Sequence, residues 1–162
     1  MNCNIEKELQ RADDLESLEK YDDSISIYND LIKIEGNNAR LFALRGFAKY
    51  KAKYFKDAID DFSNAIKLKA NVPTTLFFRA RSKEEIGNLD GALKDYEECA
   101  KIDQDKYDIH LNMGLIYEYK GKLKKAKEKY QAVLNLDPTN EIALERLNKI
   151  KKHQIKHNSN SR

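Results

Sequence analysis

The stretch YDIHLNMGLIYEYKGKLKKAKEKYQAVLNLDPTN, residues 107–140, decides the fold of this chain of 162 residues. Three earlier stretches fall into register with it when the sequence is offset by 34 residues, and no insertion separates them. They span residues 5–38, 39–72 and 73–106. A fixed period of this length is typical of a solenoid built from helix-turn-helix units. The period therefore predicts four such units, and it favours binding over catalysis as the function.

Three positions of the repeat keep the same kind of residue in all four units. Positions 8 and 20 are always small and position 24 is always aromatic: Ala12, Gly46, Ala80 and Gly114; Ser24, Ala58, Ala92 and Ala126; Tyr28, Phe62, Tyr96 and Tyr130. A small residue is expected where two helices approach so closely that a larger side chain would overpack the contact. An aromatic ring can fill the space beside it.

A short polar break separates the two helical runs of each unit. It reads Glu19-Lys20, Lys53-Tyr54, Gly87-Asn88 and Gly121-Lys122 in chain order. Glycine commonly ends a helix because it tolerates the left-handed conformation there. Each unit is therefore predicted as a helix of ~12 to 14 residues, a tight turn and a second helix of similar length.

This pattern resembles the tetratricopeptide repeat family. The fourth unit matches the family consensus at Gly114, Tyr117, Ala126, Tyr130 and Pro138, and the second unit at Gly46, Ala58, Phe62 and Ala65. The resemblance covers residues 5–140. It implies an all-α fold, a right-handed α-solenoid of four helix-turn-helix repeats.

The residues after the fourth repeat are expected to close the solenoid. Within residues 141–157 the apolar side chains recur at helical spacing: Ala143, Leu144, Leu147, Ile150 and Ile155. A solenoid needs such a capping helix to cover the apolar edge of its last unit. We expect one domain over residues 1–157, followed by a frayed tail at 158–162.

The second and third repeats carry a pair of charges that the family pattern does not explain. Arginine stands at position 7 as Arg45 and Arg79, and aspartate at position 23 as Asp61 and Asp95. A link between successive repeats would leave Arg45 facing Ile27, whereas pairing within each repeat satisfies both arginines. We therefore predict a partly buried Arg-Asp bond between the two helices of each middle repeat. The alternative is two unrelated solvated charges.

The first helices of stacked repeats line the concave side of a solenoid, and in the family this face is the ligand groove. Here the face is rich in apolar and aromatic side chains flanked by arginines, a composition typical of interaction sites. The predicted groove consists of Arg40, Leu44, Phe47, Tyr50, Lys51, Phe77, Phe78, Arg81, Leu111, Asn112, Leu115 and Tyr119. The alternative is that some of these side chains, especially Phe77 or Phe78, turn into the core between repeats.

The best-known ligand mode of the family is a clamp of lysine and asparagine side chains that grips the C-terminal carboxylates of chaperone tails. In the two registers that the chain allows, the clamp positions carry Leu9, Asp13, Leu44, Thr74 and Phe78, or Ala43, Phe47, Phe78, Asp108 and Asn112. Neither register supplies the cations. We therefore predict a protein or peptide ligand that is not a chaperone tail gripped by this clamp.

Several other classes of function are disfavoured. No apolar run approaches the ~18 residues of a membrane span, and the N-terminus MNCNIEKELQ lacks the layout of a secretory signal, so we expect a cytoplasmic protein. No catalytic or phosphate-binding arrangement is present, so neither an enzyme nor a cofactor is expected. His153 and His157 sit four residues apart, but nothing completes a metal-binding set. Cys3 and Cys99 are too far apart in sequence for a disulfide framework or a zinc site.

The leading interpretation is a non-enzymatic protein-binding module that docks a peptide or helix of a partner, as an adaptor, an assembly chaperone or an immunity-type inhibitor. Nucleic-acid binding is an alternative, because Lys49, Lys51, Lys53 and Lys56 cluster in the second repeat. The net charge of only +3 and the charge of −6 over residues 5–38 oppose it. Self-association through the concave face or an end surface is a third interpretation. Residues 141–162 carry a charge of +4.

Overall fold

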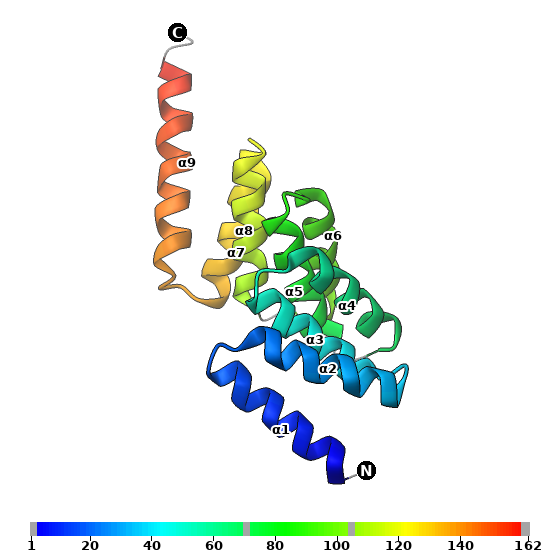
Figure 1. Cartoon of the computed structure of the whole chain (residues 1–162). Helices are drawn as coiled ribbons and strands as arrows, with labels where there is room; N and C mark the ends of the chain where they lie inside the picture. The colour runs from blue at the N-terminus through cyan, green and yellow to red at the C-terminus, as the bar shows by residue number, and fades with distance from the viewer. Residues whose placement is uncertain (1–2, 70–71, 104–105, 160–162) are drawn as a thin grey trace. The chain divides into compact units, whose positions relative to one another are not determined.

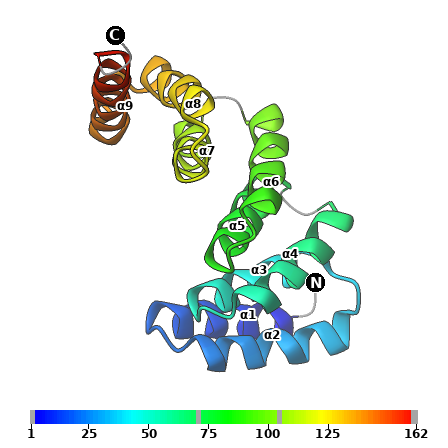
Figure 2. The same ribbon diagram turned by 90° about the horizontal axis from the view of Figure 1, so that it is seen from above.

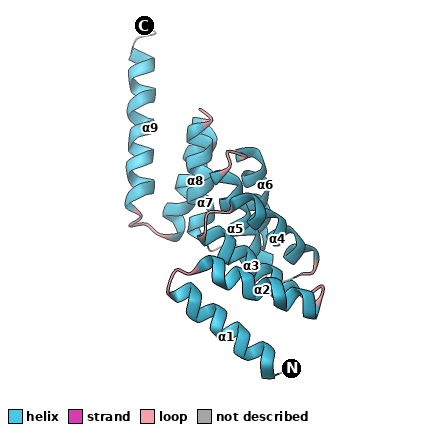
Figure 3. Ribbon diagram, in the orientation of Figure 1, coloured by secondary structure: helices cyan, strands magenta, loops and turns pink. Residues whose placement is uncertain are grey.

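The computed structural model describes residues 3–69, 72–103 and 106–159, and within these ranges every regular element is a helix (Figures 1 and 3). In chain order the helices are α1 Cys3–Ser17, α2 Tyr21–Glu35, α3 Ala39–Lys51, α4 Phe55–Lys67, α5 Val72–Glu85, α6 Leu89–Ile102, α7 Tyr107–Tyr119, α8 Leu123–Leu136 and α9 Glu141–Ser159. The predicted all-α fold of helix-turn-helix repeats is confirmed. Helix α9 corresponds to the predicted capping helix, and residues 160–162 of the predicted tail lie outside the described residues.

The helices belong to two compact units, Met1–Asp95 and Tyr96–Arg162, whose boundary falls within α6. In the first unit, consecutive helices from α1 to α5 pack on one another, and α3 also contacts α5. In the second unit, α7 packs on α8 and α8 on α9. Figure 2 shows these helices as successive antiparallel hairpins.

The turn inside each repeat contains one residue in the left-handed conformation. Glu19, Lys53, Gly87 and Gly121 have φ values of 58°, 65°, 76° and 69°. The residue that follows each of them donates its backbone N–H, at 2.8 Å, to the carbonyl oxygen five positions earlier. This bond closes the preceding helix. Glycine occupies this position in only two of the turns. In the other two, Glu19 and Lys53 adopt the left-handed conformation, which costs a residue with a Cβ atom about 1 kcal/mol.

The small and aromatic repeat positions meet between the two helices of a repeat, as predicted. A Cβ atom added to Gly46 would lie 2.8 Å from the ring of Phe62, and one added to Gly114 would lie 2.6 Å from the ring of Tyr130. Real Cβ atoms do not approach other atoms so closely, so an alanine at Gly46 or Gly114 would force the ring or the helices to shift.

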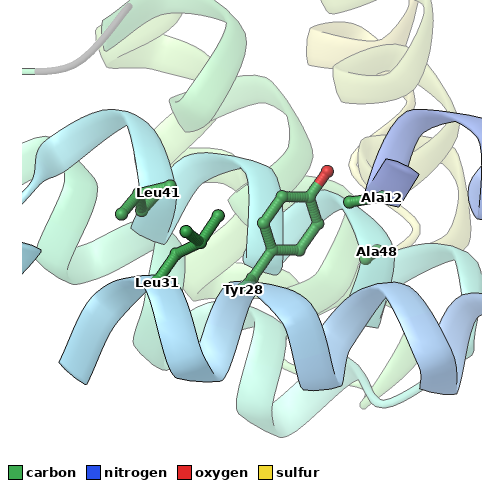
Figure 4. Packing of buried hydrophobic residues seen from close by; sticks show 5 residues of the cluster. All are labelled: Ala12, Tyr28, Leu31, Leu41 and Ala48. Atoms are coloured by element: carbon green, nitrogen blue, oxygen red, sulfur yellow. The ribbon is translucent and has the colours of Figure 1, made fainter. Parts of the chain in front are cut away.

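In the first unit the small residue and the aromatic residue of the first repeat belong to a core shared by three helices (Figure 4). Ala12 comes from α1, Tyr28 and Leu31 from α2, and Leu41 and Ala48 from α3, and all are at most 3% exposed. Burying such side chains contributes roughly 25 cal/mol per Å² of apolar surface. The core therefore fixes α3 against the first hairpin.

Helix α9 packs through one stripe of apolar residues in the second unit. Ala143, Leu147 and Ile150 are buried, while Leu144 is 42% exposed. The expectation that Leu144 belongs to the packed stripe is wrong, because it lies about 100° around the helix from Ala143. The side chain of Asn140 caps the helix by accepting a hydrogen bond from the backbone N–H of Ala143 at 3.1 Å.

Candidate protein-binding surface

Two buried ion pairs fix the orientation of α3 and α5. Arg45 donates from Nε and Nη2 to the Asp61 carboxylate at 2.8 and 2.5 Å, and Arg79 bonds Asp95 in the same bidentate way at 2.8 and 2.8 Å. The aspartate side chains are only 3% and 5% exposed. The prediction that these charges pair within each middle repeat is confirmed.

Each carboxylate also receives a lysine, which the sequence analysis missed. The ammonium groups of Lys49 and Lys83 lie 2.7 Å from Asp61 and Asp95. In the fourth repeat this position carries Tyr117, whose hydroxyl donates to Glu97 at 3.3 Å. The signal was present, because lysine replaces the family's tyrosine in the two repeats that also carry the Arg-Asp pair.

The same arginines reach back to the preceding helix. Arg45 donates from Nη1 to Asn29 on α2 at 2.7 Å, and Arg79 donates to Ser63 on α4 at 3.2 Å. Each guanidinium thus connects three helices through a fixed fork of donors. Arg45 and Lys49 lie on one side of α3, and helical geometry places Phe47 on the opposite side.

On that opposite side, three aromatic side chains from α3 and α5 pack together. The ring centroids of Phe47 and Phe78 lie 4.8 Å apart, and those of Tyr50 and Phe78 lie 5.3 Å apart, both pairs edge to face. All three rings remain partly exposed. We call Phe47, Tyr50 and Phe78 the aromatic cluster. Two rings of α4 pack against the cluster. The ring centroid of Phe62 lies 5.2 Å from that of Phe47, and the ring centroid of Phe55 lies 5.8 Å from that of Tyr50.

The other predicted groove residues are distributed over both units. Arg40 and Lys51 on α3 are exposed, and Leu44 and Arg81 are partly exposed. Phe77 is only 8% exposed and packs against Phe78 with centroids 5.4 Å apart. Phe77 therefore belongs mainly to the core of the first unit.

Four predicted groove residues lie on α7 in the second unit. Leu111 is buried, Leu115 is partly exposed and Tyr119 is 83% exposed. Asn112 donates from Nδ2 to the hydroxyl of Tyr96 at 3.3 Å. These residues form no ring cluster comparable to the one on α3 and α5 among the side chains that the structure describes.

Charged groups of both signs surround the aromatic cluster. A cleft of about 400 Å³ is lined by Tyr50, Lys51, Lys53, Phe55 and Glu85. Arg81 contacts Glu84 with Nε and Oε2 3.7 Å apart. Lys49, one of the lysines on which the nucleic-acid alternative depends, is bound to buried Asp61. Lys49 therefore adds no free cation to that lysine cluster, whereas Lys51, Lys53 and Lys56 are exposed.

In the first and fourth repeats, a tyrosine hydroxyl connects the two helices. Tyr28 donates to Glu16 at 2.8 Å, and Tyr130 donates to Glu118 at 2.7 Å. Burial raises the pKa of both tyrosines, and the carboxylate that each one bonds raises it further. Burial also raises the pKa of Glu16 above its ordinary value, against the smaller opposing effect of the Tyr28 hydrogen bond.

The described side chains contain no group of three or more histidine, cysteine, aspartate or glutamate residues suited to a metal ion. The side chains of His153 and His157 lie outside the described part of the chain. Within the described ranges no helix combines the length and the apolar character needed to span a bilayer.

Comparisons with known proteins agree with this architecture. Two sequence profiles of the tetratricopeptide repeat family match residues 73–106 and 107–140. The small glutamine-rich tetratricopeptide repeat-containing protein 2 of Mycosarcoma maydis is 31% identical over 111 residues, which make up 68% of this chain and 29% of that protein. Hsc70-interacting protein 1 of Drosophila melanogaster is 28% identical over 108 residues, covering 62% of this chain and 29% of that protein. The chain thus matches less than a third of each relative's length.

A solved structure shows the same fold over nearly the whole chain. The structure of MamA 41-end from Desulfovibrio magneticus RS-1 aligns with a TM-score of 0.87 at 16% identity, and the alignment covers 98% of this chain and 90% of that one. At this identity the likeness concerns the fold alone. The two profile matches and the 31% identical relative identify the chain as a tetratricopeptide repeat protein.

Proposed function

We propose that this protein is a non-enzymatic interaction module that binds a peptide or helix of a partner protein on the face formed by α3 and α5. The observation that carries the proposal is the aromatic cluster, which stays partly exposed although its rings are packed against one another. Tetratricopeptide relatives such as Hsc70-interacting protein 1 are named for protein partners. The module would serve in the cytoplasm as an adaptor, an assembly chaperone or an inhibitor of its partner.

The cluster has the physical properties of a binding hot spot. Aromatic rings provide a large contact area with few rotatable bonds, so little conformational entropy is lost on binding. Here the edge-to-face packing of Phe47, Tyr50 and Phe78 already restricts the rings. The buried pairs of Arg45 with Asp61 and of Arg79 with Asp95 hold α3 and α5 in the orientation that presents them.

The chemistry of the surface favours an apolar anchor on the ligand. A terminal carboxylate requires cations, and the clamp positions carry Leu44, Thr74 and Phe78 instead. An apolar or aromatic ligand side chain can pack on the cluster. The exposed side chains of Arg40, Lys51 and Glu85 are then available to polar groups that flank the anchor.

The test is affinity capture from the native lysate with wild-type protein and with Phe47→Ala/Tyr50→Ala. We expect the double variant to lose specific partners that the wild type retains. Tyr54→Ala is the matched control, because Tyr54 is an aromatic residue of the same unit that is 45% exposed and lies outside the predicted groove. Circular dichroism should show that all three proteins are folded. Capture of the same proteins by the wild type and the double variant would contradict the proposal.

A further inference from the structure

A second surface lies on the first hairpin, away from the aromatic cluster. A cleft of about 590 Å³ runs between α1 and α2, and its lining residues all come from these two helices. The lining is apolar at its floor and acidic at its rim: Ile5, Leu15 and Ile27 with Glu8, Asp23 and Asp30. We call it the acidic cleft. Leu31 of the core in Figure 4 also lines it, and Ile5 and Ile27 pack against that core, so the floor of the cleft adjoins the core.

The acidic character of the cleft is only partly compensated within the hairpin. Arg11 contacts Glu8 at 3.5 Å and Lys33 contacts Asp30 at 2.8 Å, but both pairs are exposed. Exposed ion pairs contribute little and exchange readily with other partners. Residues 5–38 as a whole carry a charge of −6. The cleft therefore favours an occupant that is apolar on one side and basic around it.

Helix α9 presents such a surface. Its buried stripe of Ala143, Leu147 and Ile150 faces its own unit, and other sides of the described part of the helix are exposed. On one of them Leu144 is 42% exposed, and Lys151 lies two turns further along the same side. Lys152 is also exposed, and residues 141–162 carry a charge of +4.

We propose that α9 of a second copy of this protein docks in the acidic cleft. Leu144 of that copy packs on the isoleucines and leucine of the floor, and its lysines face the carboxylates of Asp23 and Asp30. Charge complementarity of this kind orients the partners and speeds their encounter. This surface is distinct from the α3–α5 face. The experiment on self-association therefore tests this proposal independently of the proposed partner binding.

The contact has a consequence that a symmetric dimer would not share. The two docking surfaces differ, so copies linked by this contact either close into a ring of two or more copies or extend into an open chain. The contact depends on one exposed leucine and on exposed charges, so the association is weak and depends on concentration. Salt screens the exposed charges and weakens it further.

The experiment measures mass in solution by sedimentation equilibrium over increasing concentration at low salt. The cleft variant is Asp23→Lys/Asp30→Lys, and the helix variant is Leu144→Ala/Lys151→Ala/Lys152→Ala. Each variant lacks one of the two surfaces, so each alone should associate at least about tenfold more weakly than the wild type. When the two variants are mixed in equal amounts, the cleft variant still has an intact α9 and the helix variant still has an intact cleft. The α9 of the first can therefore dock in the cleft of the second. The mixture should form a complex of two chains of 18.8 kDa each and grow no further.

Matched controls separate docking from a general effect of charge. Asp57→Lys/Asp60→Lys on α4 and Lys124→Ala/Lys127→Ala on α8 change exposed residues of the same types elsewhere. Both controls should associate like the wild type. All substituted residues are exposed, so circular dichroism should show unchanged folding. A wild type that stays monomeric at every concentration, a mixture that fails to form the two-chain complex, or controls as weak as the variants would each overturn the proposal.

Discussion

The second repeat and the outer repeats connect their two helices with different chemistry, and the third repeat carries the residues of both kinds, because Tyr96 and Glu84 stand where the outer repeats have the tyrosine and the glutamate. In the second and third repeats, a bidentate Arg-Asp pair with an added lysine connects the two helices. In the first and fourth repeats, a tyrosine hydroxyl donates to a glutamate, Tyr28 to Glu16 and Tyr130 to Glu118. The ionic connection is the more sensitive to mutation, because loss of one partner leaves buried charge uncompensated.

The difference also decides what the binding face can carry. In the outer repeats the glutamate occupies position 12, one of the positions predicted to face the groove. In the second repeat Phe62 replaces the tyrosine and has no hydroxyl to satisfy, so position 12 carries Tyr50 instead. Tyr50 then joins the aromatic cluster with Phe78.

The largest effect is expected where the ionic connection is broken. Asp61→Ala leaves Arg45 and Lys49 without their carboxylate and should lower the free energy of unfolding by about 3–5 kcal/mol. Chemical denaturation measures this. Asp60→Ala, at the exposed neighbouring position, should change stability by at most about 0.5 kcal/mol. Equal losses in the two variants would show that the Arg-Asp pair does not connect the helices.

A smaller effect is expected from crowding the helix contact of the fourth repeat. Gly114→Ala adds a Cβ atom 2.6 Å from the Tyr130 ring and should cost about 1–3 kcal/mol of overpacking. Up to about 1 kcal/mol of helix propensity offsets this cost. In thermal unfolding, Gly114→Ala should have a lower midpoint temperature than the control variant Gln131→Ala, which changes an exposed residue of α8. A midpoint at or above the wild-type value would mean that the contact is looser than described.

The burial of Glu16, on the first helix of the first repeat, should make stability depend on pH. The pKa of Glu16 is raised above its ordinary value of 4.5 in the folded protein, so the folded state binds the proton more tightly than the unfolded state. The resulting stabilisation is fully present below pH 4.5 and is lost as pH rises through the raised pKa. Wild type should therefore gain stability relative to Glu16→Gln as pH falls through this window. A constant difference between the two proteins over the acid range would contradict this.

The smallest effects concern the turns. Lys53→Gly should stabilise the protein by about 1 kcal/mol, because φ at this position is 65° and glycine adopts that conformation without a steric penalty. Gly87→Ala should destabilise it by a similar amount, since φ there is 76°. Paired denaturation curves test the opposite signs. Two changes of the same sign would refute the shared left-handed turn.

The sequence was sufficient for those features that repeat at the 34-residue period. The contact between Gly46 and Phe62 and the pairing of Arg45 with Asp61 followed from comparing repeats, because each unit places the same residue types in the same environment. The lysine at Lys49 was missed because it was compared with the family consensus rather than with Asp61 of its own repeat.

The limits of the binding face were harder to predict. Position 5 of the repeat lies at the margin of the predicted face, and its residues Ala43, Phe77 and Leu111 are 8%, 8% and 9% exposed. Helical spacing alone places such residues on the face. Whether a marginal side chain is covered depends on how close the neighbouring helices approach, which sequence periodicity does not contain.

Site-specific photo-cross-linking tests the central claim most directly. A benzophenone amino acid in place of Tyr50 puts a reactive aromatic group inside the aromatic cluster, and the same group in place of exposed Tyr54 serves as the reference. After irradiation in native lysate, mass spectrometry should find a partner protein joined through its apolar residues at position 50 and absent at position 54. Cross-linking that is absent at position 50, or equal at the two positions, would contradict the assignment of the α3–α5 face as the binding surface.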